Sequence, residues 1–174
     1  LNLQTALYVG FIPGLTTNPA NNSTPTTTPT TTPTTTPAPS GPAILPTVFP
    51  VLGPCWFADT WKAPRAGGRQ HEGVDIIGAR GLPLVAVKDG VITKLITNQT
   101  LSGNAIRLTI ADGTYFYYAH LDAFAEGITV GTQVAAGQVI GYNGSTGSTS
   151  PHLHFEVHPR GGAAVNPYPF VKAV

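Results

Sequence analysis

Residues 83–120 read PLVAVKDGVITKLITNQTLSGNAIRLTIADGTYFYYAH, and this stretch decides the fold class. It contains short runs rich in Val, Ile, Thr and Tyr, which the turn signals Asp89-Gly90 and Asp112-Gly113 separate. No window carries the sustained apolar period of about 3.6 residues that an amphipathic helix shows. The stretch therefore predicts antiparallel strands joined by tight turns.

Runs of the same kind continue on both sides of this stretch, with a further turn signal at Asn143-Gly144. Many short strands at this spacing are typical of an all-β fold, either an antiparallel sandwich or a barrel. We expect at most one helical turn, near Asp122–Ala125. The predicted strands are Gly73–Ile77, Pro83–Val87, Gly90–Thr97, Asn104–Ile110, Tyr115–His120, Gln138–Tyr142 and Leu153–His158.

Charge divides the chain into two regions. The 9 Lys and Arg, the 8 Asp and Glu and the 5 His all lie from Asp59 onward. Three Thr-Thr-Thr-Pro units end at Pro29, Pro33 and Pro37, and proline at every fourth position favours an extended spacer. We therefore predict a remnant of an upstream segment at 1–20, a Thr/Pro-rich linker at 21–44 and one folded domain at 45–174.

The overall charge limits the possible partners. A net charge of +1 with 10% charged residues leaves no basic patch for a phosphate backbone, which excludes nucleic acid as a partner. No apolar run reaches the roughly 18 residues of a membrane-spanning helix. We expect a monomer without a membrane span in this chain. The single cysteine, Cys55, cannot form an internal disulfide, and we expect a buried, inert thiol.

The first histidine pattern is His71-Glu72-Gly73-Val74-Asp75. Its glycine and its β-branched residues disfavour a helix. In a fully extended strand, four residues span about 13 Å, which is too far for His71 and Asp75 to chelate one ion. The backbone should therefore bend, and Gly73 is the residue that allows a bend.

The second pattern is His152-Leu153-His154, between Pro151 and Phe155. Period-two alternation places both histidines on one face of a strand, about 7 Å apart. One histidine can then bind a metal ion, and the other can reach a water molecule bound to that ion.

His71, Asp75 and one of the pair His152 and His154 offer two imidazoles and one carboxylate. This is the ligand set of a catalytic zinc ion, which keeps its fourth position open for water. His120 follows an aromatic run and, considered alone, is typical of a packed, hydrogen-bonded side chain. His158 is interpreted as a surface histidine at a strand end, outside the site.

Beyond these patterns, the chain resembles the lysostaphin-type, LytM-like zinc metalloendopeptidases over roughly residues 50–170. The resemblance implies a β-sandwich fold and activity on peptide bonds of bacterial peptidoglycan, in the stem peptide or the cross-bridge. It also implies an extracellular or cell-envelope location. The motifs that carry it, in the order of the family, are GRQHEGVD at 68–75, VAVKDGV at 85–91, YAHL at 118–121, GQVIG at 137–141 and PHLHFE at 151–156.

The resemblance assigns His71, Asp75 and His154 as zinc ligands and His120 and His152 as the remaining active-site histidines. Zinc bound in this way lowers the pKa of its water from about 16 toward about 7. His152 is the predicted general base, and His120 is predicted to stabilise the oxyanion or to orient the water. The sequence leaves the division of roles between the two open.

Two other functions compete with this one. A non-catalytic LytM-like module could bind wall peptides or regulate another hydrolase, but the complete ligand set favours an enzyme. A cupin-type metal protein could use His152, His154 and Glu156, but it requires a further histidine downstream, where only His158 is present. The loops Thr97–Gly103 and Tyr142–Ser150 are the predicted determinants of specificity.

Overall fold

The computed structural model describes residues 46–174, so the predicted segments 1–20 and 21–44 lie outside the described residues. None of the helices in the described part is long and apolar enough to cross a membrane. The strands are β1 (Cys55–Phe57), β2 (Val74–Gly78), β3 (Pro83–Val85), β4 (Gly90–Gln99), β5 (Gly103–Thr109), β6 (Tyr115–Leu121), β7 (Ala123–Phe124), β8 (Gln133–Val134), β9 (Val139–Tyr142) and β10 (His152–His158). The helical elements are η1 (Ala66–Gly68), η2 (Pro159–Gly161) and α1 (Tyr168–Lys172).

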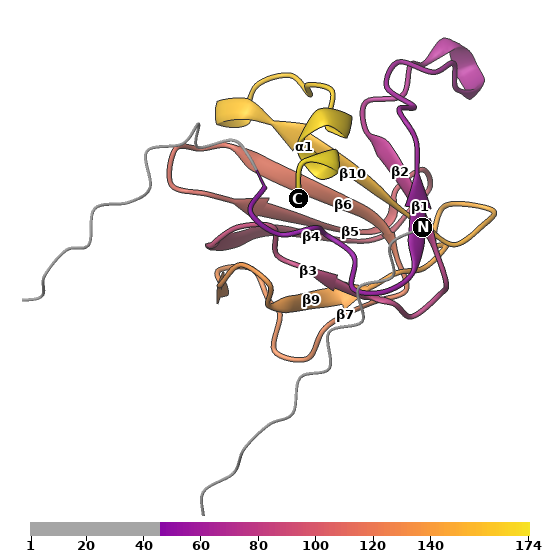
Figure 1. Cartoon of the computed structure of the whole chain (residues 1–174). Coiled ribbons are helices and arrows are strands. Elements are labelled where there is room, and N and C mark those ends of the chain that lie inside the picture. The colour runs from indigo at the N-terminus through magenta and orange to yellow at the C-terminus, as the bar shows by residue number, and fades with distance from the viewer. Residues whose placement is uncertain (1–45) are drawn as a thin grey trace, which may run out of the picture. The chain divides into compact units, whose positions relative to one another are not determined.

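The strands form two antiparallel sheets. The larger sheet has seven strands in the order β1-β2-β10-β6-β5-β4-β8, and the smaller sheet has three in the order β3-β9-β7. Figure 1 shows the smaller sheet beside the face formed by β4, β5 and β6. The predicted all-β antiparallel sandwich is confirmed.

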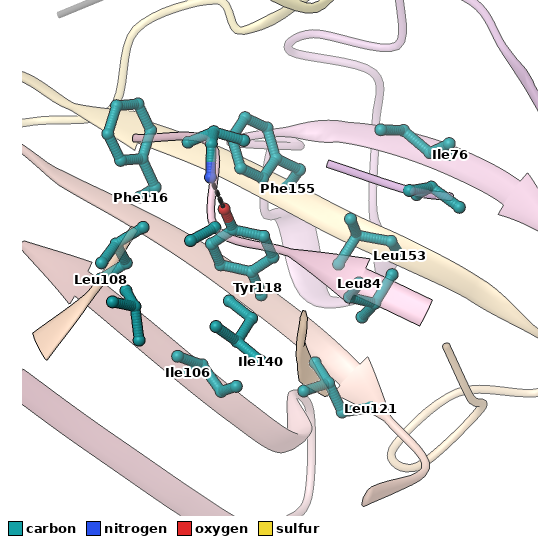
Figure 2. Packing of buried hydrophobic residues seen from close by; sticks show 14 of the residues in the cluster. Ile76, Leu84, Ile106, Leu108, Phe116, Tyr118, Leu121, Ile140, Leu153 and Phe155 are labelled. Carbon is teal, nitrogen blue, oxygen red and sulfur yellow. Dashed lines mark hydrogen bonds between the residues drawn. The ribbon is translucent and has the colours of Figure 1, made fainter. Parts of the chain in front are cut away.

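The core lies between the two sheets. Alternate residues of the long strands point inward, among them Phe116 and Tyr118 of β6 and Phe155 of β10, and all three are fully buried (Figure 2). The hydroxyl of Tyr118 donates to Val85 O and accepts from Val87 N, both at 3.0 Å. This side chain therefore ties the larger sheet to the segment that begins with β3.

All seven predicted strands are present with ends within two residues of those expected. The expectation of at most one helical turn, near Asp122–Ala125, is wrong. Ala123 and Phe124 form β7 and pair with Tyr142 and Gly141 of β9, and the short helical elements η1, η2 and α1 form elsewhere. Ladder hydrogen bonds to β9 override the weak local preference of this segment. Cys55 is partly rather than fully buried, and burial raises the pKa of its thiol, in keeping with an inert role.

Candidate metal centre and groove

The candidate site lies on the outer face of the larger sheet, where β2 and β10 are neighbours. His154 of β10 is directly opposite Asp75 of β2 in the antiparallel register. Both side chains point away from the core, whereas Leu153 and Phe155 point into it. His152 and His154 therefore share one face, as the alternation predicted.

His71 reaches this face from the segment just before β2. Its backbone N–H donates to Ala63 O at 2.9 Å, and its carbonyl accepts from Lys62 N at 2.8 Å. The predicted bend at Gly73 is present. A Cβ at Gly73 would lie 2.6 Å from Phe155 O and 2.7 Å from Cε1 of His154, so the close approach of the two segments requires glycine.

Three donor atoms converge at this point. His71 Nε2 lies 2.8 Å from His154 Nδ1 and 3.0 Å from Asp75 Oδ1, and His154 Nδ1 lies 3.1 Å from Asp75 Oδ1. Tetrahedral ligands about 2.0 Å from one zinc ion lie about 3.3 Å from one another. The side chains of His71, Asp75 and His154 thus form a group that could hold a metal ion.

Hydrogen bonds on the far side of each imidazole orient these donors. His71 Nδ1 lies 2.8 Å from Thr60 O, and a carbonyl can only accept, so Nδ1 carries the proton and Nε2 offers a lone pair. His154 Nε2 lies 2.7 Å from Glu156 Oε1 and donates to it, which directs Nδ1 toward the site. A carboxylate or carbonyl behind a ligating histidine commonly fixes its tautomer in this way.

The charges of the site are strongly coupled. Without a metal ion, burial by itself would raise the pKa of Asp75, but the close contacts of its carboxylate with His154 and His71 hold it well below its usual range. Burial would lower the pKa of His154, but hydrogen bonds to Asp75 and Glu156 raise it to about 9. The Arg65 guanidinium also pairs with Asp75 Oδ2, which leaves Oδ1 to the histidines.

His152 and His120 lie beside this group without belonging to it. His152 Nε2 is 3.7 Å from Asp75 Oδ1, and the ring centroids of His120 and His152 are 4.6 Å apart. His152 Nδ1 donates to Ser150 O at 2.9 Å, and His120 Nδ1 donates to Thr146 O at 2.8 Å. In the neutral form of each imidazole, Nε2 is therefore the nitrogen that can accept a proton.

An irregularity in β6 brings His120 to the site. The pairing with β5 shifts between Asn104 and Ile106, and His120 has a left-handed φ of 68°. One extra residue in a strand turns the following side chain to the other face. Without it, strict alternation from Tyr118 would place His120 in the core. In the structure His120 is instead partly buried at the groove, and it keeps the hydrogen bond to Thr146 O that a packed histidine was expected to make.

A groove runs over these residues. One wall comes from the segment around Lys62, Arg65 and Arg69, and the other from the segments 99–102 and 147–148. The second wall belongs to the two loops predicted to determine specificity. The sheet face with His71, Asp75, His120, His152 and His154 forms the floor.

The sequence interpretation missed two residues behind the site. His158 is only 8% exposed rather than a surface side chain, and its Nε2 lies 2.6 Å from Glu156 Oε2 while its ring stacks on Tyr115 at 4.2 Å. Glu156 thus bridges His154 and His158, and these hydrogen bonds lower its pKa to about 2 against the effect of burial. The period-two pattern of 152–158 already indicated that these side chains share a face.

Known proteins are similar to this chain over the region that carries these motifs. The sequence profile of Peptidase family M23 matches residues 69–167. The L-Ala–D-Glu endopeptidase of Bacillus subtilis (strain 168) is 37% identical over 130 residues, which cover 67% of this chain and 40% of that protein. The glycyl-glycine endopeptidase ALE-1 of Staphylococcus capitis is 40% identical over 111 residues, which cover 61% of this chain and 30% of that protein.

The fold also resembles that of a solved peptidase structure. The catalytic domain of the antimicrobial peptidase lysostaphin from Staphylococcus simulans superposes with a TM-score of 0.61 at 34% identity, over 68% of this chain and 92% of that domain. The matched region spans less than half the length of the two relatives compared by sequence.

Proposed function

The chain belongs to Peptidase family M23, and from this we propose that it is a zinc-dependent endopeptidase that hydrolyses peptide bonds of bacterial peptidoglycan, in the stem peptide or the cross-bridge. The observation that carries the proposal is the convergence of His71 Nε2, Asp75 Oδ1 and His154 Nδ1 on one point. Such an enzyme works outside the cell membrane, so we propose an extracellular or cell-envelope location.

The donor set fits zinc. Two neutral imidazoles and one carboxylate are typical of catalytic zinc sites, and each imidazole already has its other nitrogen engaged. His71, Asp75 and His154 would hold the ion. A zinc ion bound there supplies a Lewis acid that makes hydroxide available near neutral pH and polarises a carbonyl group.

His152 and His120 supply the proton transfers and polar contacts. The free Nε2 of His152, on the same strand face as His154, accepts the proton of the attacking water and returns it to the leaving amine. His120 Nε2 orients the water or, when protonated, donates to the oxygen of the tetrahedral intermediate. Burial and the nearby histidines lower the pKa of His120 to about 4, which favours the orienting role at neutral pH.

Digestion of purified walls tests this function. The zinc-loaded protein is incubated with peptidoglycans that differ in cross-bridge chemistry, and the released fragments are identified by mass. New peptide termini are expected from at least one wall, and chelation followed by restored zinc should abolish and recover their release. The position of the new termini identifies the bond cleaved.

If the chain is instead a non-catalytic module that binds the wall, the same digestion experiment should give a different result. A protein that sediments with the wall and holds zinc but releases no fragment from any of these walls would contradict the endopeptidase function. The variant Asp75→Asn serves as the control, because it keeps the shape of the side chain but weakens the site for a cation.

A further inference from the structure

A second, smaller pocket lies on the same sheet face beyond the metal centre. It opens beside the groove and shares Tyr117 and Glu156 with it. Its lining residues are Lys94, Ile96, Arg107, Tyr115, Tyr117 and Glu156. Four neighbouring strands supply them, β4, β5, β6 and β10, which lie side by side in Figure 1.

Arg107 is held in place within this pocket. Its Nε donates to Thr93 Oγ1 at 2.9 Å, and that hydroxyl lies 2.6 Å from Thr109 Oγ1. Its guanidinium carbon lies 5.1 Å from the centroid of the Tyr115 ring. A guanidinium has five N–H donors, so the remaining donors of this fixed group are available to a planar anion such as a carboxylate.

Lys94 adds a second cation to the pocket. It is directly opposite Arg107 in the register of β4 and β5, and like charges in that position destabilise a sheet. Among residues 46–174, neither Lys94 nor Arg107 has a carboxylate within salt-bridge distance. A bound anion would remove this repulsion.

Glu156, at the other end of the pocket, does not neutralise the charges of Lys94 and Arg107. Its two oxygens accept hydrogen bonds from His154 and His158, so its charge is already engaged. Across the sheet, Glu156 pairs with Tyr117, which pairs with Arg107, which pairs with Lys94. Tyr117 thus separates the two cations from the engaged carboxylate.

The sheet geometry places this pocket at a defined distance from the metal centre. Arg107 is two strands away from His154 and two residues along the strand direction. Strand spacings of about 4.8 Å and rises of about 3.4 Å per residue give a separation of about 12 Å. An extended peptide covers this distance in three to four residues.

We propose that Arg107 and Lys94 form a subsite that binds a carboxylate of the substrate peptide three to four residues from the bond that is cleaved. The inference rests on the proposed endopeptidase function and narrows its substrate to acidic wall peptides. The groove with the metal centre positions the reacting bond, and the cationic pocket selects the strand of peptide that carries the charge. An uncharged oligoglycine segment gains nothing from this subsite.

The test compares one peptide mixture in two charge states. Soluble stem peptides from one purified peptidoglycan are labelled with a fluorophore, and half of the sample is amidated with a carbodiimide and ammonium chloride. Binding of both forms is measured by fluorescence anisotropy. The wild-type protein is expected to bind the acidic form about tenfold more tightly, as one charge-assisted contact allows.

Arg107→Gln and Lys94→Gln should each reduce this preference while the affinity for the amidated form stays the same. Arg107→Lys should restore part of it. Lys88→Gln is the matched control, since Lys88 is a cation of the same domain outside both pockets. Lys94 is exposed, so its variant keeps the test valid if Arg107→Gln fails to fold.

The outcomes separate this inference from the proposed function. Fragment release from the wall together with equal binding of the two peptide forms would overturn the subsite alone. Variants that weaken binding of both forms equally would overturn the subsite as well. Charge-dependent binding that Arg107→Gln abolishes, without fragment release, would support the subsite and reject the endopeptidase function.

Discussion

Asp75 is the residue on which most contacts of the site depend. Its Oδ1 lies within 3.1 Å of a nitrogen of both His71 and His154, and its Oδ2 pairs with Arg65. Oδ1 is thus the oxygen that can bind a metal ion, and Oδ2 pairs with the neighbouring positive charge. A site built on so few donors has no spare ligand.

We therefore expect His71→Ala, Asp75→Ala and His154→Ala each to abolish zinc binding. Each variant removes one of three donors, and the two that remain fall short of the three protein ligands that a catalytic zinc site uses. Elemental analysis after gel filtration measures the zinc, and circular dichroism checks that the variants are folded. Full occupancy in all three variants would refute the assignment of ligands.

His120→Ala and His152→Ala should keep zinc and lose most of the activity. Neither side chain belongs to the ligand group, but both keep an Nε2 free beside it. Acid–base assistance contributes about 10²–10⁴-fold and one oxyanion donor about 10²–10³-fold. Turnover on peptidoglycan near the wild-type rate, with zinc retained, would make both histidines structural.

The buried His120 also predicts a pH dependence of stability. Because burial lowers its pKa in the folded protein to about 4 from the usual 6.5, only the unfolded chain gains a proton between these values. The stability that the neutral imidazole provides is complete above about pH 6.5 and is lost as the pH falls toward 4. In metal-free protein, the free energy of unfolding should therefore fall more steeply for the wild type than for His120→Gln, measured by urea titration at pH 7.5, 5.5 and 4.5. Parallel curves would mean that His120 titrates normally.

At the scale of elements, seven strands were predictable because each lies in a short run rich in Val, Ile, Leu, Thr or aromatic residues, and turn signals separate many of these runs. The alternation in 152–158 also predicted correctly that His152 and His154 share a face. Strands β1, β7 and β8 have only two or three residues and belong to no longer run of this kind, whereas the three residues of β3 begin the apolar run 83–87. Their existence depends on partners elsewhere in the chain.

The irregularity at His120 could not be predicted from the sequence either. One extra residue in β6 leaves no mark in the sequence, because the strand carries neither glycine nor proline there. The YAHL motif pointed to His120 by resemblance, whereas its aromatic neighbours alone favoured a packed side chain. The role of Glu156 could not be predicted either. It depends on where His158 lies, and the stacking of His158 on Tyr115 determines that position.

The connection between the two sheets gives a prediction about stability. Tyr118→Phe removes the hydroxyl that accepts from Val87 N and donates to Val85 O, and both backbone groups are then buried without a partner. We expect a loss of about 1–3 kcal/mol in the free energy of unfolding. Tyr142→Phe, at a residue 37% exposed, is the control and should change the denaturation midpoint little. Equal midpoints for both variants would show that this hydroxyl does not stabilise the fold.

At the scale of the whole molecule, the first residues that the structure describes already pack on the core. Thr47 N donates to Val87 O at 2.9 Å, and the 5% exposed Val51 forms a bridge with Leu84 of β3. The residues between Thr47 and Val51 therefore belong to the packed domain. The proline-rich residues before them contain no charged side chain and no pattern that would bury a core.

A protein beginning at Leu45 should consequently keep a cooperative thermal transition, the zinc site and the activity of the longer chain. A protein beginning at Gly53 loses the Thr47 hydrogen bonds and the buried side chain of Val51, and so its transition should move to lower temperature by several degrees. Scanning calorimetry of the three proteins measures the difference, and gel filtration reports whether each is a monomer. A non-cooperative transition for the Leu45 protein would move the boundary upstream, and equal transitions for the Leu45 and Gly53 proteins would move it downstream. Either result would change which backbone holds β3 against the sheet that carries the metal centre.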